Sequence, residues 1–206
     1  MIHLHTHSQY SLRDSIIRPD ELASRLQELG QGAVAITDHG GSLGGISLYK
    51  KLKKAGIKYI HGCELYVCDD VSVKDKNNRY YHLVALCKDD TGRLNLNKLI
   101  SMSEHPDRKY YKPRVDFAML QELGGGMIFM SACLAGEVSR ALLDGDYDKA
   151  KEVALRYKEQ FGEDYYLEIQ SHRDPEQERV NHDIVRLAHE TGISLVVTTD
   201  AHYLLE

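Results

Sequence analysis

Short apolar segments alternate with longer amphipathic segments along most of this chain. Short apolar runs predict buried strands, whereas apolar residues at about every third or fourth position predict helices with one face on a core. The expected strands cover residues 1–5, 33–37, 57–67, 80–87, 127–132, 164–170 and 194–199. The expected helices cover residues 19–29, 44–56, 94–105, 116–124, 137–145, 146–162 and 175–192.

This alternation predicts an α/β fold. Continuous apolar strands joined by helices favour a parallel sheet that helices cover on its outer face. Seven such strands favour closure into a distorted (β/α)7 TIM-like barrel, in which chemistry lies at the C-terminal rim of the strands. The polar stretch 68–79 shows no clear element and is interpreted as an exposed loop.

Composition sets the broad class of protein. With 206 residues and 42% hydrophobic content, we expect residues 1–206 to form a single domain. The net charge of −5 argues against holding nucleic acid by bulk electrostatics, although bound divalent cations would reverse the field inside a cleft. Four cysteines without a CxxC pair, and no apolar leader, favour a reduced, cytoplasmic protein. No apolar run approaches the roughly 20 residues that cross a bilayer, so no membrane role is expected.

Imidazole, carboxylate and thiol side chains recur where the expected strands end. His5 and His7 lie at the first strand, and Asp200 and His202 follow the last. We expect each such donor to end or follow its strand, which would bring all of them to one rim. A chain that returns repeatedly to one place with these donors predicts a site for several metal ions. The donors between the two pairs are His39, Glu64, His82 and Cys133.

Each of these residues also has an ordinary structural interpretation. His3 alternates with His5 and His7, but it lies further from the rim and is expected to support a ligand or to pack. Asp38 should point away from His39 and orient a ligand or bond to backbone. Taken by itself, His82 could be a hydrogen-bonded histidine in the core. Cys133 could be a small buried residue with no ligand role. Spacing leaves Asp14 open between a ligand and a turn or cap. The remaining histidines are expected to be structural or solvated: His61, His105, His172, His182 and His189.

The motifs HLHTHS, AITDHG, GCELYV, YYHLVAL, SACLAGEV and TTDAHYL occur in this order. Together they resemble the polymerase and histidinol phosphatase (PHP) domain family, most closely the version at the N-terminus of bacterial DNA polymerase III alpha subunits. The resemblance covers essentially the whole chain. It implies a distorted seven-stranded barrel that holds two to three zinc, manganese or iron ions. Carried over by motif position, the implied ligands are His5, His7, Asp14, His39, Glu64, His82, Cys133, Asp200 and His202.

The resemblance implies metal-dependent phosphoester hydrolysis, with His5, His7, Asp200 and His202 acting through the metals. The expected substrate is a DNA 3′ end, shortened in the 3′ to 5′ direction as in proofreading during replication. The chain ends just after the last motif, so polymerase palm, fingers and thumb are not expected in it. Two alternatives remain: a small-molecule phosphatase or pyrophosphatase, and a non-catalytic scaffold that metal stabilises and that docks the rest of a polymerase or a replisome subunit.

Overall fold

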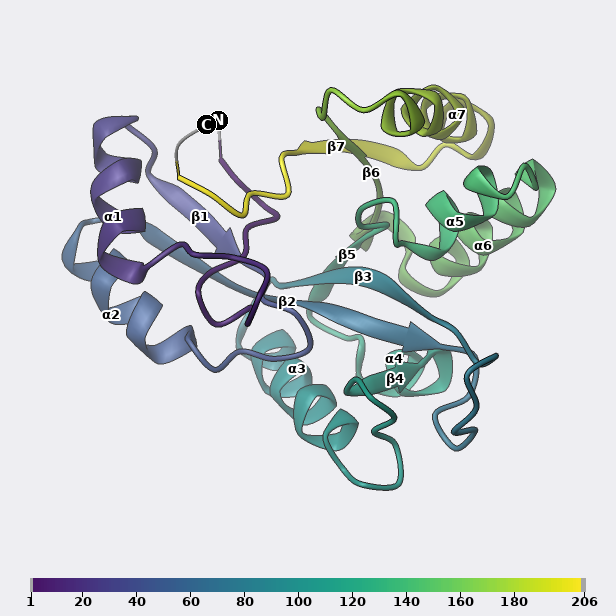
Figure 1. The fold of residues 1–206 in the computed structure, drawn as a ribbon, viewed down its shortest axis with the longest axis horizontal. Helices are drawn as coiled ribbons and strands as arrows, with labels where there is room; N and C mark the ends of the chain where they lie inside the picture. Colours follow the sequence, from purple (N-terminus) through teal and green to yellow (C-terminus); the bar gives the residue numbers. More distant parts are fainter. Residues whose placement is uncertain (1, 205–206) are drawn as a thin grey trace.

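The computed structural model describes residues 2–204, and it shows one curled sheet with helices on its outside (Figure 1). The strand order is β1-β2-β3-β5-β6-β7, and β4 pairs with β2 beside this path. The strands are β1 (Ala33–Ile36), β2 (Lys58–Cys68), β3 (Tyr80–Cys87), β4 (Arg114–Asp116), β5 (Met127–Met130), β6 (Tyr165–Gln170) and β7 (Ser194–Thr198).

The N-terminal segment closes this sheet into a barrel. His3 pairs with Val34 of β1, while Thr6 pairs with Ala201 beyond β7, so the segment lies between the first and last strands (Figure 1). The prediction of a strand over residues 1–5 is wrong for the described residues 2–5, because the chain bends between the two isolated bridges. Residue 1 lies outside the described residues. The predicted α/β, TIM-like barrel class is confirmed.

The prediction of an all-parallel sheet is wrong at β3. This strand runs antiparallel to both β2 and β5, whereas the other pairings are parallel. The physical reason lies in residues 69–79, which join β2 to β3 without a helix; parallel neighbours need a crossover connection of a dozen or more residues, usually helical. The short strand β4 was also missed, because its three residues carry too little pattern to be recognised.

Six of the seven predicted helices match the structure to within two residues at each end, and the third begins at residue 90, four residues earlier than predicted. Four helices begin at an aspartate whose side chain accepts a hydrogen bond from the backbone N–H three residues later. Each such cap stabilises its helix by about 1 kcal/mol. The capping residues are Asp89, Asp116, Asp146 and Asp174. The helices are α1 (Pro19–Glu28), α2 (Gly45–Lys54), α3 (Asp90–Ser103), α4 (Phe117–Leu123), α5 (Glu137–Leu143), α6 (Tyr147–Phe161) and α7 (Pro175–Thr191), with a 3-10 turn at Gly162–Asp164.

The two faces of the strands differ in character. Alternate residues such as Leu65, Phe129 and Leu167 point outward and pack in the main core against α3 to α7. A second core lies between α1, α2 and β1. The opposite face points into the barrel, where a small apolar cluster that includes Val84 and Met130 fills one end. The other end of the barrel interior is therefore left for polar side chains.

Arg114 fastens two loops beside that end. Its side chain is fully buried and donates to the backbone carbonyls of Val71, Val73 and Arg108 at 3.1–3.3 Å. These contacts join the loop 69–79 to the segment 104–113. A buried backbone carbonyl that loses its donor costs about 1–3 kcal/mol.

Replacing Arg114 by Met is expected to destabilise the protein by roughly 2–4 kcal/mol, because several buried carbonyls lose their donor together. Urea unfolding followed by circular dichroism measures the change. Arg93→Met, which removes an exposed ion pair with Asp90, is the matched control and should cost under about 1 kcal/mol. Equal midpoints for the two variants would show that Arg114 does not fasten the loops.

Candidate metal centre

The inner faces of the strands carry the buried polar groups of the barrel. Glu64 on β2, His82 on β3 and Glu168 on β6 all lie on this face, by the same alternation that sends their neighbours outward. Glu64 lies within its strand and His82 near the start of its strand, so the expectation that every donor ends or follows a strand is wrong for these two. Because β3 is antiparallel, its beginning reaches the same rim as the ends of the parallel strands.

The structure brings the nine residues expected as ligands together at this rim: eight of them belong to groups of metal-type donors, and Cys133 lies beside Glu64 and His82. Donor atoms within 4.8 Å of one another form three groups. His7 belongs to two of the groups, as does His39, so the groups adjoin. The groups are His5, His7 and Asp200; His7, Asp14, His39 and His202; and His39, Glu64 and His82.

Glu64 lies at the middle of the cluster. Its Oε2 lies 3.2 Å from His7 Nε2 and 2.8 Å from His39 Nδ1, and its Oε1 lies 3.0 Å from His82 Nδ1. Cys133 Sγ lies 3.6 Å from His82 Nδ1 and 3.8 Å from Glu64 Oε1. One fully buried carboxylate therefore touches side chains from every part of the site.

Three imidazole rings are held by hydrogen bonds on their outer nitrogen. Nδ1 of His5 faces Glu168 Oε1 at 2.7 Å, and Nδ1 of His202 faces the Asp200 carbonyl at 2.7 Å. Nδ1 of His7 lies 2.9 Å from Ser11 Oγ, which itself donates to Asp38. These acceptors hold a proton on Nδ1, so each ring turns its Nε2 into the cluster. Metal-binding histidines are oriented in the same way.

Buried carboxylates control the protonation of the central histidines. Burial alone would lower the pKa of His7, but the carboxylates of Asp200 and Glu64, each 3.2 Å from its Nε2, outweigh burial and raise the pKa to about 9. Burial would raise the pKa of Asp200, yet His5 and His7 hold it at about 2. The pKa of Glu64 is also held well below its usual range, because His5 and His39 outweigh its burial. The rim is therefore a region of strong affinity for cations.

The donor arrangement fits transition-metal ions. Asp200 Oδ1 lies 3.2 Å from Nε2 of both His5 and His7, but within residues 2–204 it makes no hydrogen bond, and neither does His39 Nδ1. In the described part of the chain these atoms lie close to other donors without hydrogen-bonding to them, and a shared cation would satisfy them. Ligands of one tetrahedral zinc ion lie about 3.3 Å apart, given bonds of about 2.0–2.1 Å. A metal ion would take the place of the second ring proton.

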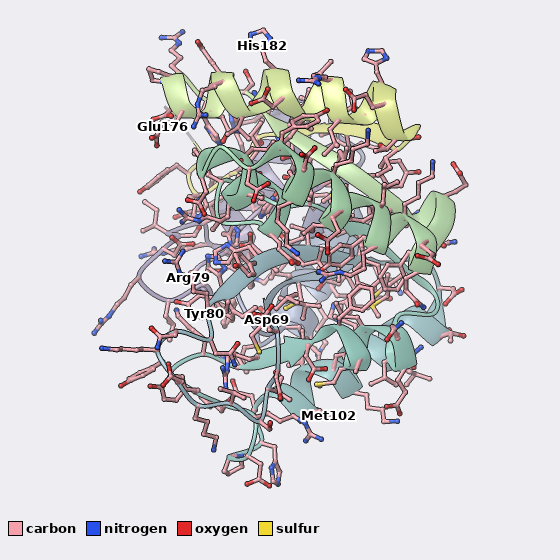
Figure 2. All side chains as sticks on the ribbon, turned by 90° about the vertical axis from the view of Figure 1, so that its right-hand side faces the viewer. Asp69, Arg79, Tyr80, Met102, Glu176 and His182 are labelled. Atoms are coloured by element: carbon pink, nitrogen blue, oxygen red, sulfur yellow. The ribbon has the colours of Figure 1, made fainter. Side chains whose placement is uncertain are left out.

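The residues expected to support the site lie outside the three donor groups. Asp38 points away from the donors and accepts from Ser8 N at 2.6 Å and from Ser8 Oγ at 2.7 Å. His3 bonds to Thr199 outside the cluster. His61 bonds to Tyr59 and Asn97. The other histidines are exposed, and Figure 2 shows His182 projecting from the outer side of α7.

Sequence reasoning missed Glu168. This side chain is fully buried and accepts from His5, Gln170 and Thr198, while its second oxygen has no partner among the described residues. The signal that identified Glu64, a carboxylate within an apolar strand, is also present in YYLEIQ. Ser11 was also missed, because a serine in a polar loop carries no such signal.

Replacing Glu168 by Ala is expected to weaken metal binding by about 10- to 100-fold, as the loss of a group that orients a ligand commonly does. Competition with a chromogenic chelator measures the affinity. Glu168→Gln retains an acceptor for His5 and should lose less. The exposed Glu159→Ala is the matched control. Unchanged affinity in folded Glu168→Ala protein would exclude this role.

An α/β barrel with clustered metal-type donors at one rim is the class that this fold and site define. The family model described as PHP domain matches residues 3–172, and the chain belongs to this family. DNA polymerase III subunit alpha of Treponema pallidum is 42% identical over 207 residues, and that of Aquifex aeolicus is 38% identical over 214 residues. Both alignments cover 98% of this chain and 18% of the relative, so the chain spans about a fifth of these curated relatives.

Two solved structures share the fold. A candidate metal-dependent phosphoesterase from Bifidobacterium adolescentis superposes with a TM-score of 0.60 at 15% identity. An amidohydrolase from Chromobacterium violaceum, with bound SO4 and no metal, superposes with a TM-score of 0.58 at 17% identity. Each match covers 98% of this chain and 87% of the other. At these identities the likeness shows the fold alone.

Proposed function

We propose that this chain is a metal-dependent phosphoesterase and, more specifically, a 3′ to 5′ exonuclease that acts on DNA. The observation that carries the proposal is the sharing of His7 and His39 among three adjoining donor groups. Adjacent metal positions a few ångströms apart suit in-line displacement at a phosphoester. DNA is favoured as the substrate because the curated relatives are DNA polymerase III alpha subunits.

The proposed cofactor is two to three divalent ions, held by the nine donors. Imidazoles with one thiol suit zinc, and manganese and iron accept the same imidazole and carboxylate ligands. When bound, such ions activate water for attack at neutral pH and stabilise charge on the phosphoryl oxygens.

The protein's own residues fix the geometry of that chemistry. Glu64 and His7 hold neighbouring positions together, while Glu168, Ser11 and the Asp200 carbonyl prevent the rings from turning. A hollow of about 740 Å³ opens over this rim, and Arg13 and Lys112 line it together with Asp14 and His39. A phosphodiester entering this hollow would meet the cations Arg13 and Lys112, and Glu104 also lines the hollow.

The polymerase context is part of the proposal. We propose that the domain works at DNA 3′ ends alongside a replicative polymerase, either joined to it or docked on a replisome subunit. None of the helices within residues 2–204 is long and apolar enough to span a membrane.

The test is the shortening of a 5′-labelled single strand by protein loaded with Mn²⁺ or Zn²⁺. The expected result is a ladder that shortens stepwise from the 3′ end, stops with chelator and is blocked by a modified 3′ terminus. A chromogenic phosphomonoester is assayed under the same conditions. Brisk monoester hydrolysis without DNA shortening would replace this proposal with a small-molecule phosphatase. Inactivity on both substrates with all ions bound would favour the scaffold.

A further inference from the structure

The residues other than glycine that have left-handed backbone conformations lie close to the rim of the barrel. Within residues 2–204, four such residues have positive φ: Arg13, Tyr111, Ala132 and Asp200. Asp200 is an expected ligand, and Arg13 and Ala132 precede the expected ligands Asp14 and Cys133. Strain of this kind costs about 1–3 kcal/mol and concentrates at functional sites. Tyr111 is the one member of the set that is not at or next to an expected ligand.

Tyr111 occupies an unusually tight turn. Its φ is 57°, and the next N–H, from Lys112, bonds to the Tyr110 carbonyl at 2.7 Å, which closes a three-residue turn around Tyr111. Positive φ is a genuine outlier for a bulky side chain. The turn leaves Tyr111 84% exposed, so packing does not explain its aromatic ring.

The ring is nevertheless supported from behind. Tyr110 meets it edge-on with centroids 4.6 Å apart, and the guanidinium of buried Arg114 lies 5.3 Å from the Tyr110 centroid. Arg114 is fixed in turn by the carbonyls of Val71, Val73 and Arg108. The exposed Tyr111 ring is therefore backed by side chains that are themselves held in place, Tyr110 and Arg114.

The turn separates two hollows on the surface. Tyr110 and Tyr111 line a hollow of about 590 Å³, whereas Lys112 and Pro113 line the larger one over the metal-type donors. Tyr80 and His82 line both, so the hollows adjoin at an expected metal ligand. Three cations, Lys76, Arg79 and Arg140, line the smaller hollow against two carboxylates, Asp75 and Asp144. Arg79 and Tyr80 lie on the same flank of the molecule in Figure 2.

We propose that Tyr111 is a stacking platform for a base of single-stranded DNA whose 3′ end lies at the metal-type donors. This inference rests on the proposed exonuclease function and names the path of its substrate. The terminal nucleotide occupies the larger hollow, and the strand leading to it crosses Tyr80 into the smaller hollow. There a base stacks on Tyr111 and Arg79 contacts a backbone phosphate, while Lys112 contacts a phosphate nearer the 3′ end in the larger hollow. An exposed aromatic ring beside cations is the usual platform for unpaired bases.

The test combines a protein change with a substrate change. Metal-loaded wild type and Tyr111→Ala are titrated with a 12-nucleotide thymidine strand that carries a phosphorothioate at its 3′ end. Tyr111→Ala is expected to raise Kd at least about 5-fold, and Tyr111→Phe to restore binding, since stacking needs the ring and not the hydroxyl. In shortening assays KM should rise with kcat little changed. Tyr49→Ala, at an exposed tyrosine on α2 outside both hollows, is the control.

Abasic substitutions then locate the stacked base. Removing a base one position at a time should weaken wild-type binding at one position among the few nucleotides before the 3′ end, and Tyr111→Ala should abolish that dependence. If wild type shortens DNA but Tyr111→Ala binds every strand equally well, the platform is refuted and the exonuclease stands. If wild type neither binds nor shortens DNA, both proposals fall together.

Discussion

His202→Ala is expected to lower the rate of DNA shortening by at least about 100-fold while the protein stays folded. His202 Nε2 lies 2.8 Å from Asp14 Oδ2, and its ring stacks on His7 with centroids 4.5 Å apart. The change therefore removes a metal-type donor that lies beside His7, a residue that belongs to two of the three donor groups. His202 is partly exposed and belongs to no apolar core, so the fold should tolerate its loss.

Rates under saturating metal, compared with circular dichroism spectra, measure this effect. His189→Ala, on the exposed side of α7, is the matched control and should change little. Full activity of His202→Ala would remove this residue from the site. His5→Ala should be equally inactive but less stable, because buried Glu168 and partly buried Asp200 would each lose a histidine partner.

Metal loading is expected to raise the melting temperature by roughly 10 °C. Ions at 1,000 times their Kd stabilise the folded state by about 4 kcal/mol, and each kcal/mol shifts Tm by about 2–4 °C for a chain of this size. The gain is expected because ions would neutralise buried Glu64 and partly buried Asp200, whose carboxylates both lie within 3.4 Å of His5 Nε2.

Differential scanning calorimetry with and without Zn²⁺ or Mn²⁺ measures this shift. His7→Ala removes the donor shared by two groups and should lose most of it, whereas His189→Ala should retain it. Chelator should return wild type to the lower temperature and abolish hydrolysis. A melting temperature independent of metal would contradict tight binding at this rim.

Hydrophobic periodicity predicted the longer helices well because their amphipathic faces extend over several turns, and it also found the seven-residue helices α4 and α5. Periodicity did not predict the direction in which a strand runs relative to its neighbours. Nothing in the residues of β3 reveals that the strand is reversed. The signal lay instead in the helix-free stretch 69–79, which is easier to reconcile with an antiparallel neighbour than with a crossover.

The candidate site was predictable to the extent that its residue types are unusual in their setting. His5, His7, Asp200 and His202 stand out because polar donors flank apolar strands. Asp14 does not stand out, since an aspartate in a loop is ordinary, and only the family resemblance implied its role. In the structure its carboxylate faces both His39 and His202.

The geometry of Tyr111 could not be inferred from its sequence. Adjacent tyrosines in YYKPRVD reveal neither the positive φ nor the exposure of the second ring. The support behind the ring involves Arg114, whose partners Val71 and Val73 come from a loop some forty residues earlier in the chain. Tertiary contacts of this kind have no local signature.

Crystals of protein loaded with zinc or manganese, measured at the absorption edge of that metal, test the polynuclear centre most directly. The predicted result is two or three anomalous peaks at the rim, each about 2.0–2.3 Å from donor atoms of the nine residues. At least one peak should contact His7 Nε2. A single peak, or peaks only at surface residues outside the rim under saturating metal, would contradict the centre and the hydrolysis proposed from it.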